Sequence, residues 1–300
     1  MKKFFIHILF LTLGIISCDE PLPTQIIKPD VPDDVQVDLE VLSPEPDLFI
    51  YNSGYDTLGF ISAFPPDKPI INVSGIKNSY KNLTFYRTTV FALFIDKKLR
   101  VERKDGRLIG FGSRLVGETS FNNIQSKIIP RIVKYKWENN ILDTFLGVAH
   151  LLYYNRGSNS LFPFPYESSI TFKLNPIVGE SSEVNIPTPI EITGKINASG
   201  SLRKRNLKIE LGWNGTKDGK IEIVVGGMNP TDHVPFPLYK IKVRDSGRVT
   251  VPQTLMETFP FDKFKQIVFS FSRQKFVGNP RSSRNIIIAQ SIHNIKFDVP

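Results

Sequence analysis

Apolar and polar residues alternate with a period of two over most of the second half of the chain. Residues 207–213 (LKIELGW) place their apolar side chains on one face, and residues 220–225 (KIEIVV) repeat the pattern. The six residues between them, 214–219 (NGTKDG), contain two turn-forming dipeptides. Such alternation is typical of strands with one buried face, and the turn residues predict that the two strands form a hairpin.

The same pattern continues in both directions along the chain. Residues 239–251 (YKIKVRDSGRVTV) indicate two strands around a turn at Asp245-Ser246-Gly247. The first half alternates less regularly, but residues 99–111 (LRVERKDGRLIGF) surround the tight-turn dipeptide Asp105-Gly106. Helical patterns are sparse, and the best of them is 252–259 (PQTLMETF), with Pro252 as the first helical residue. The chain is therefore predicted to be all-β.

Short strands about every ten residues, separated by turn residues, favour antiparallel β-sandwiches. The stretch 160–170 (SLFPFPYESSI), rich in proline and aromatic residues, indicates a junction. We expect a first β domain over residues 47–168 and a second β-sandwich domain over 169–300. By strand pattern alone, the second half resembles the immunoglobulin-like modules of bacterial surface lipoproteins, although the Cys-Trp-Cys hallmark is absent. That resemblance implies two immunoglobulin-like sandwiches.

The first 18 residues have the layout of a secretory signal. Lys2 and Lys3 precede a run at 4–16 that is almost entirely apolar and too short to span a bilayer. The run ends in Ile15-Ile16-Ser17-Cys18, which resembles the lipobox of bacterial lipoproteins. The resemblance implies that residues 1–17 are a signal peptide and that Cys18 carries a diacylglyceryl thioether, so the partner at this end would be a membrane.

An acidic segment separates this signal from a basic body. Residues 19–47 carry nine acidic residues, one base and six prolines, which predicts an extended, self-repelling tether over 18–46. Its later part, 35–42 (VQVDLEVL), alternates well enough to be the first strand. Residues 48–300 carry 35 bases and 20 acids. This excess suits acidic polysaccharide, anionic lipid or a lysine-rich solvated surface, whereas a secretory signal argues against nucleic acid.

The chain offers little recognisable chemistry. Cys18 is the single cysteine, so its acylation would leave no disulfide, thiol nucleophile or Cys-based metal site. The three histidines outside the signal, His150, His233 and His293, have no second histidine within ligand spacing. Residues 110–117 (GFGSRLVG) miss the G-x-G-x-x-G spacing of a phosphate loop. We predict no catalytic residues, no metal and no cofactor.

Aromatic residues are the candidate binding groups. Trp137, Tyr153, Tyr154 and Tyr166 are predicted to stack on a glycan, with packing at a domain junction as the alternative for the three tyrosines. We expect a membrane-anchored envelope lipoprotein that binds or scaffolds a glycan or a protein partner without catalysis. Two alternatives remain open: a glycan-directed envelope hydrolase with a site assembled from scattered residues, and an accessory subunit of an outer-membrane uptake system.

The residues after the lipobox bear on the membrane. Asp19 directly after Cys18 resembles the inner-membrane retention signal of enterobacteria. The acidic pair Asp19-Glu20 also resembles the surface-export signal of Bacteroidetes-type lipoproteins. A composition rich in Lys, Asn, Ile and Phe favours the second interpretation. We therefore expect a lipid-anchored protein of the cell envelope, at the outer membrane or the cell surface.

Overall fold

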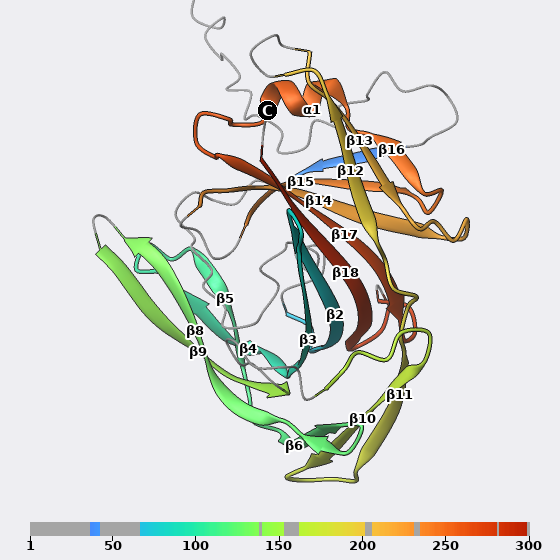
Figure 1. The fold of residues 1–300 in the computed structure, drawn as a ribbon. Coiled ribbons are helices and arrows are strands. Elements are labelled where there is room, and N and C mark those ends of the chain that lie inside the picture. Colours follow the sequence, from blue (N-terminus) through green and yellow to red (C-terminus); the bar gives the residue numbers. More distant parts are fainter. Residues whose placement is uncertain are drawn as a thin grey trace, which may run out of the picture.

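The computed structural model describes residues 37–42, 67–137, 140–152, 162–201, 206–230, 235–280 and 282–298. These residues form three β-sheets of eleven, four and three strands and one short helix, α1 (Gln253–Thr258) (Figure 1). The prediction of an all-β protein built from sandwiched, mainly antiparallel sheets is confirmed.

The large sheet contains β1 (Asp38–Val41), β15 (Phe236–Arg244), β14 (Lys220–Met228), β17 (Gln266–Phe276), β18 (Ile286–Asp298), β2 (Ile70–Tyr80), β3 (Leu83–Leu93), β9 (Asn140–Leu152), β5 (Leu108–Ser113) and β4 (Ile95–Glu102) in that spatial order, with β8 (Lys127–Trp137) paired to β9. The smaller sheets contain β11 (Ser182–Pro187), β10 (Ser169–Pro176), β6 (Gly117–Phe121) and β7 (Ile124–Gln125), and β12 (Gly194–Ser199), β13 (Lys208–Trp213) and β16 (Arg248–Thr250).

The large sheet joins the two ends of the chain. β18 pairs in parallel with β2 along eleven residue pairs, from Ile286↔Ile70 to Lys296↔Tyr80. The sheet is thus continuous across the expected domain boundary at residues 168 and 169, and the division into two domains stays a prediction. Beyond β3 the sheet bends away, because β9 pairs with β3 at only three residues. Figure 1 shows β8 and β9 (green) diverging from β2 and β3.

One face of the large sheet, here called the apolar face, is covered by both smaller sheets. Over β1, β15, β14 and β17 it presents side chains such as Ile223, Ile241 and Phe269, all fully buried. The sheet β12–β13–β16 and helix α1 pack on them with residues such as Ile209 and Leu255. This packing forms the larger of the hydrophobic clusters.

The four-stranded sheet covers the apolar face further along, over β2, β3 and β18. Val73, Val90 and Ala289 of the large sheet pack against Phe121 and Ile170 of the small one. The other face of the large sheet, here called the polar face, carries Lys240, Val224, Ser270 and Asn294 side by side in register.

The hairpin predicted from residues 207–225 is wrong. β13 pairs with β12 and β16, whereas β14 pairs with β15 and β17, so the two strands lie in different sheets. Their apolar residues, including Leu211 and Ile223, face each other across the same core. Residues 214–219 form an arch between sheets that lie about 10 Å apart. Alternation shows which face of a strand is buried, but it does not show which strand is its hydrogen-bonded neighbour.

The turn at Asp245 is a second arch, because it joins β15 in the large sheet to β16 in the small one. The remaining local predictions agree with the structure. β4 and β5 pair as a hairpin around Asp105-Gly106, where Gly106 has a φ of 81°. Helix α1 forms, but Pro252 is its N-cap and the helix begins one residue later. The alternation at 35–42 contains β1, which pairs with β15 at the end of the sheet.

Candidate functional site

Two of the predicted site residues, Trp137 and Tyr166, belong to the described part of the chain. Cys18, Tyr153 and Tyr154 lie outside the described residues. Trp137 is the last residue of β8, and its backbone pairs with Asn140, the first residue of β9. Tyr166 packs against the hydrophobic cluster between the four-stranded sheet and the large sheet. The stacking role of Trp137, Tyr153, Tyr154 and Tyr166 stays a prediction.

Tyr166 is held by contacts inside the protein. Its ring packs edge-on against Phe164, with 4.8 Å between the ring centroids and 62° between the ring planes, in the hydrophobic cluster beneath β2 and β18. Burial, followed by the negative charge of Glu191, raises the pKa of Tyr166 to about 12, opposed by a hydrogen bond with Ser291. The phenol is therefore neutral at physiological pH and fixed against the sheet.

The closest approach to a catalytic arrangement is Ser79 beside His293. His293 Nε2 lies 2.9 Å from Ser79 Oγ, a distance suited to a nucleophile and its base. The other ring nitrogen decides the chemistry, because His293 Nδ1 accepts a 2.8 Å hydrogen bond from the Gly194 backbone N–H. Nδ1 therefore has no proton in the neutral ring, and Nε2–H must donate to Ser79.

This tautomer is the reverse of the one a serine nucleophile needs, in which Nε2 accepts the hydroxyl proton. Burial, followed by the positive charge of Lys77, lowers the pKa of His293 to about 4. The imidazole is thus neutral and already saturated by hydrogen bonds. His293 ties the start of β12 to the large sheet, so its role is structural.

A buried ion pair between Asp245 and Arg273 holds together the two arches, at residues 214–219 and at the turn that follows β15. Asp245 is 1% exposed, and both its carboxylate oxygens accept hydrogen bonds from Arg273, at 2.8 and 3.0 Å. Trp213 Nε1 and Thr216 Oγ1 each donate to the same carboxylate at 2.7 Å. The network joins both arches to β17, so its role is structural. The sequence contained one signal of it: Arg273 occupies an inward position of an otherwise apolar alternation.

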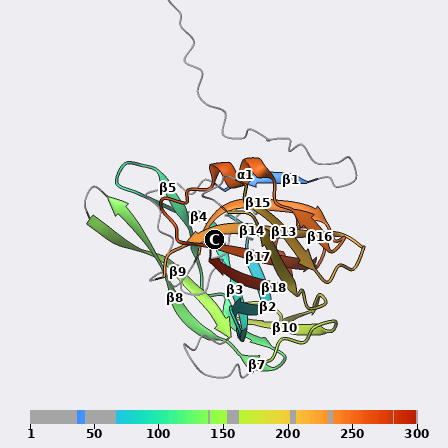
Figure 2. The ribbon, with the colours of Figure 1, turned by 45° about the horizontal axis from the view of Figure 1, so that its top comes forward.

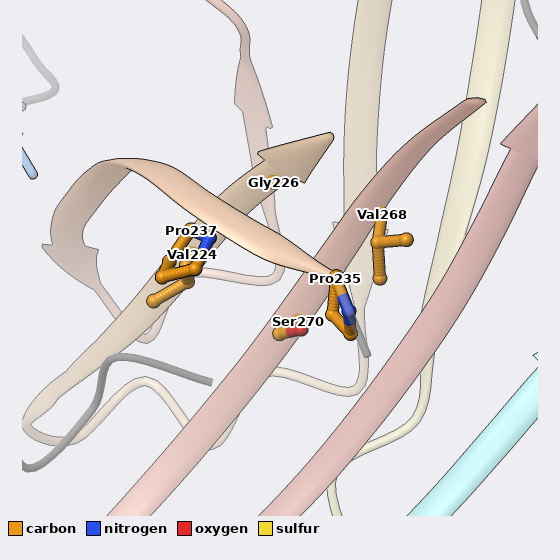
Figure 3. A pocket seen from close by; sticks show the side chains of 6 residues that line it. All are labelled: Val224, Gly226, Pro235, Pro237, Val268 and Ser270. Atoms are coloured by element: carbon orange, nitrogen blue, oxygen red, sulfur yellow. The ribbon is translucent and has the colours of Figure 1, made fainter. Parts of the chain in front are cut away.

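The polar face carries a small hollow near β14, β15 and β17. Figure 3 shows its lining of Val224, Gly226, Pro235, Pro237, Val268 and Ser270. The hollow leaves no room for even one water molecule. Its walls are mostly aliphatic and proline side chains. It is therefore packing space between strands.

The strongest surface feature is the hairpin of β4 and β5, residues 95–114, here called the basic hairpin. It contains seven bases and three acids within 20 residues. Each acid is paired with arginine: Asp96 with Arg114, Glu102 with Arg100, and Asp105 with both Arg103 and Arg107. The three lysines, Lys97, Lys98 and Lys104, are exposed and form no ion pair with any described residue.

The position of the basic hairpin makes these lysines accessible. β4 is the last strand of the large sheet, so its outer edge has no neighbouring strand among the described residues. Leu99 and Leu108 beside the lysines are 40% and 36% exposed. Figure 2 shows β4 and β5 on the side of the molecule away from the sheet β12–β13–β16. Exposed amines on an aliphatic background can bind an extended anion.

Comparison with known proteins gives no match: no protein family, no curated protein and no solved structure is similar to this chain. Within the described ranges, no helix is both long and apolar enough to cross a membrane. Across the same residues, His, Cys, Asp and Glu side chains do not gather in groups of three or more that could hold a metal ion. The excess of bases over residues 48–300 is densest in the run KKLRVERKDGR at 97–107, and this run is the sequence signal that points to the basic hairpin.

Proposed function

We propose that this protein is a lipid-anchored lipoprotein of the cell envelope that binds an acidic glycan without catalysing a reaction on it. The anchor is the lipid on Cys18, at the outer membrane or the cell surface, and the binding surface is the basic hairpin. The observation that carries the binding proposal is the charge arrangement of this hairpin. All three acids are engaged by arginines, and three exposed lysines are left for a ligand.

Electrostatic attraction suits a repetitive acidic polymer. Several weak lysine contacts along an extended chain add up, whereas one surface ion pair contributes only about 0–1 kcal/mol. The exposed aliphatic groups of Leu99 and Leu108 can contact the apolar faces of sugar rings. Lysines on an edge strand also prevent strand addition by other chains. The test must therefore separate glycan binding from protection against aggregation.

The binding test compares two variants that lose equal charge. In the first, Lys97, Lys98 and Lys104 become Gln; in the second, the exposed Lys195, Lys208 and Lys220 on other strands become Gln. Affinity for polygalacturonate and for neutral dextran is measured by titration calorimetry. We expect wild type to bind only polygalacturonate, and the hairpin variant to bind about tenfold more weakly, a loss of about 1.4 kcal/mol.

The matched control should stay within about twofold of wild type, and added salt should weaken binding by wild type. If both variants bound polygalacturonate equally weakly, the loss would come from net charge and not from the basic hairpin. Absence of wild-type binding would refute the glycan proposal. The hairpin variant could instead aggregate while its monomer fraction binds polygalacturonate with wild-type affinity. That result would show that the three lysines protect the sheet edge and do not bind glycan.

The anchor is tested separately in cells. Metabolic labelling with an alkyne fatty acid should mark wild type and leave Cys18→Ala unlabelled. Protease shaving of intact cells then reports whether the body is exposed at the surface. An unlabelled wild type would contradict lipidation, since two or three acyl chains are needed for durable attachment and each would carry the label.

A further inference from the structure

The turn between β2 and β3 and the strand ends beside it, residues 77–87 and here called the aromatic tip, expose large apolar side chains. Every residue from 81 to 87 is exposed. Leu83, Phe85 and Tyr86 are 59%, 61% and 62% exposed. Single exposed apolar residues are common on protein surfaces, whereas a group of them marks a contact surface.

The register of the sheet places these side chains on both faces of the hairpin. Phe85 pairs with Asn78, which is level with Asn294 on the polar face. Leu83 is two residues from Phe85 along the same strand, so it lies on the polar face as well. Tyr86 is the next residue after Phe85 and lies on the apolar face. The aromatic tip is therefore apolar on both sides.

The aromatic tip extends beyond the packed part of the molecule. β9 pairs with β3 only from Val90 onward, and no described strand pairs with the outer edge of β3 over 83–89. Within the described residues, the hydrophobic clusters contain none of Leu83, Phe85 and Tyr86. These three side chains therefore contribute no core packing, and their exposed apolar surface is free to contact a partner.

Bases surround the apolar side chains. Residues 77–87 contain Lys77, Lys81 and Arg87 and no acid. Lys296 of β18, which lies beside β2 in Figure 1, is level with Tyr80. Lys81 Nζ and Lys296 Nζ lie 5.1 and 5.2 Å from the centroid of the Tyr80 ring. The amines and the aromatic rings thus form one continuous surface.

Two carboxylates beside the aromatic tip offset only part of this positive charge. Glu191 lies 3.5 Å from Lys77 Nζ, and Asp298 lies 3.8 Å from Lys81 Nζ. The side chains of Lys81 and Asp298 are 68% and 50% exposed, so water weakens their attraction. Lys296 forms no ion pair with any described residue. The remaining charge favours an anionic partner.

We propose that the aromatic tip inserts into the headgroup layer of an anionic membrane. Aromatic side chains settle at the membrane interface, and lysines beside them reach the lipid phosphates. A lipid layer surrounds a tip that is apolar on both sides, whereas a glycan chain stacks on one open ring face. The Tyr80 ring already carries two amines, which makes it a poor platform for a sugar. This contact requires neither the lipid on Cys18 nor the basic hairpin.

The test places a fluorescent reporter on the aromatic tip. In a Cys18→Ala chain, Asn82→Cys supplies the sole thiol, which is labelled with a nitrobenzoxadiazole dye that brightens in apolar surroundings. Thr250→Cys, at an exposed position of β16, is the control. Vesicles of phosphatidylcholine, or of equimolar phosphatidylcholine and phosphatidylglycerol, are titrated in. We expect the dye at 82 to brighten about threefold with anionic vesicles only, and the dye at 250 to stay unchanged.

Two further variants, each carrying the reporter at 82, lose three exposed apolar side chains. The tip variant is Leu83→Ser/Phe85→Ser/Tyr86→Ser, and the control variant is Phe145→Ser/Ile177→Ser/Val178→Ser. We expect the tip variant to bind anionic vesicles at least about tenfold more weakly, and the control variant to stay within about twofold. The reporter in the otherwise unchanged chain tests insertion even if the tip variant fails to fold.

Four results would overturn the proposal. A dye at 82 that never responds to anionic vesicles would show that the aromatic tip does not insert, and an equal response to neutral vesicles would remove the role of the lysines. Brightening with polygalacturonate and no vesicles would make the tip a glycan site. Brightening with protein concentration alone would make it a contact between two copies. Because the chain has no lipid on residue 18, none of these results depends on the anchor or on the basic hairpin.

Discussion

The two faces of the large sheet contrast strongly. The apolar face alternates as the sequence predicts, and its side chains are buried against two smaller sheets by described, well-packed partners. The polar face is equally buried over β15, β17 and β18, yet it contains Lys240, Ser272 and Gln290 with unpartnered atoms. Burial on the apolar face follows from the hydrophobic effect, whereas burial on the polar face requires specific partners.

The largest effect is expected from the ion pair that closes the arches. Asp245→Ala leaves the buried guanidinium of Arg273 without its carboxylate, and we expect the free energy of unfolding to fall by about 3–5 kcal/mol. Urea denaturation measures the loss. Glu183→Gln, which removes an exposed pair with Lys173, is the control and should cost less than about 1 kcal/mol. Similar losses in both variants would mean that the arches do not depend on Asp245.

Low pH should destabilise the fold through the same carboxylate. Burial by itself would raise the pKa of Asp245, but hydrogen bonds from Arg273, Thr216 and Trp213 and the positive charge of Arg273 hold this pKa below its ordinary value. A depressed carboxyl pKa adds stability at neutral pH, and the stability is lost as pH falls through the folded-state pKa.

The second prediction compares two residues on opposite faces. Ile223→Ala on the apolar face opens a cavity in the larger core and should cost about 3 kcal/mol. Ser272→Ala on the polar face removes a hydroxyl that has no partner, and should change the free energy of unfolding by less than about 0.5 kcal/mol. Thermal and urea unfolding measure both. A large loss for Ser272→Ala would show that its hydroxyl has a partner.

The third prediction concerns the pH dependence of stability between about 6.5 and 4. The folded-state pKa of His293 is about 4, below the unfolded value near 6.5, so the unfolded chain binds a proton first as pH falls. Stability conferred by the neutral ring is therefore lost across this window, by up to about 3 kcal/mol. His293→Gln should flatten this slope. An unchanged slope would assign it to other groups, such as His150, whose pKa burial also lowers.

The smallest change in the free energy of unfolding is expected from a substitution of Lys240 on the polar face. Lys240 Nζ is buried and has no hydrogen-bond partner, so Lys240→Met replaces an unpaired amine by an aliphatic side chain of similar length. We expect the free energy of unfolding to stay within about 1 kcal/mol of wild type or to rise. Urea unfolding measures it. A loss of more than about 2 kcal/mol would show that the amine has a partner.

Alternation predicted the fold class and most inward positions, because a period of two directly reflects one buried face. It could not predict that β13 and β14 lie in different sheets, since both pairing schemes bury Leu211 and Ile223 equally well. It also could not predict the parallel pairing of β2 with β18, whose partners are more than 200 residues apart in the chain.

The candidate site was harder to predict for a related reason. Asn72 and Gln290 occupy positions that resemble solvent-facing residues, so their burial was not visible in the sequence. The charges of the basic hairpin were visible, but their availability depends on ion pairs such as Asp96–Arg114, which the fold creates. Three of the predicted site residues, Cys18, Tyr153 and Tyr154, stay predictions outside the described part of the chain.

The edge position of β1 determines how the molecule would respond to force. β1 is only four residues long and is held by a single neighbour, β15, through four residue pairs. A pull on the N-terminus reaches β1 before any other described strand, so β1 would detach while the central strands stay paired. Release of β1 would free residues 38–41 from the sheet, and the load would then fall on β2, which pairs with β18 over eleven residue pairs. The short pairing of β1 would thus yield first, and the longer pairing of β2 with β18 would hold the rest of the sheet together.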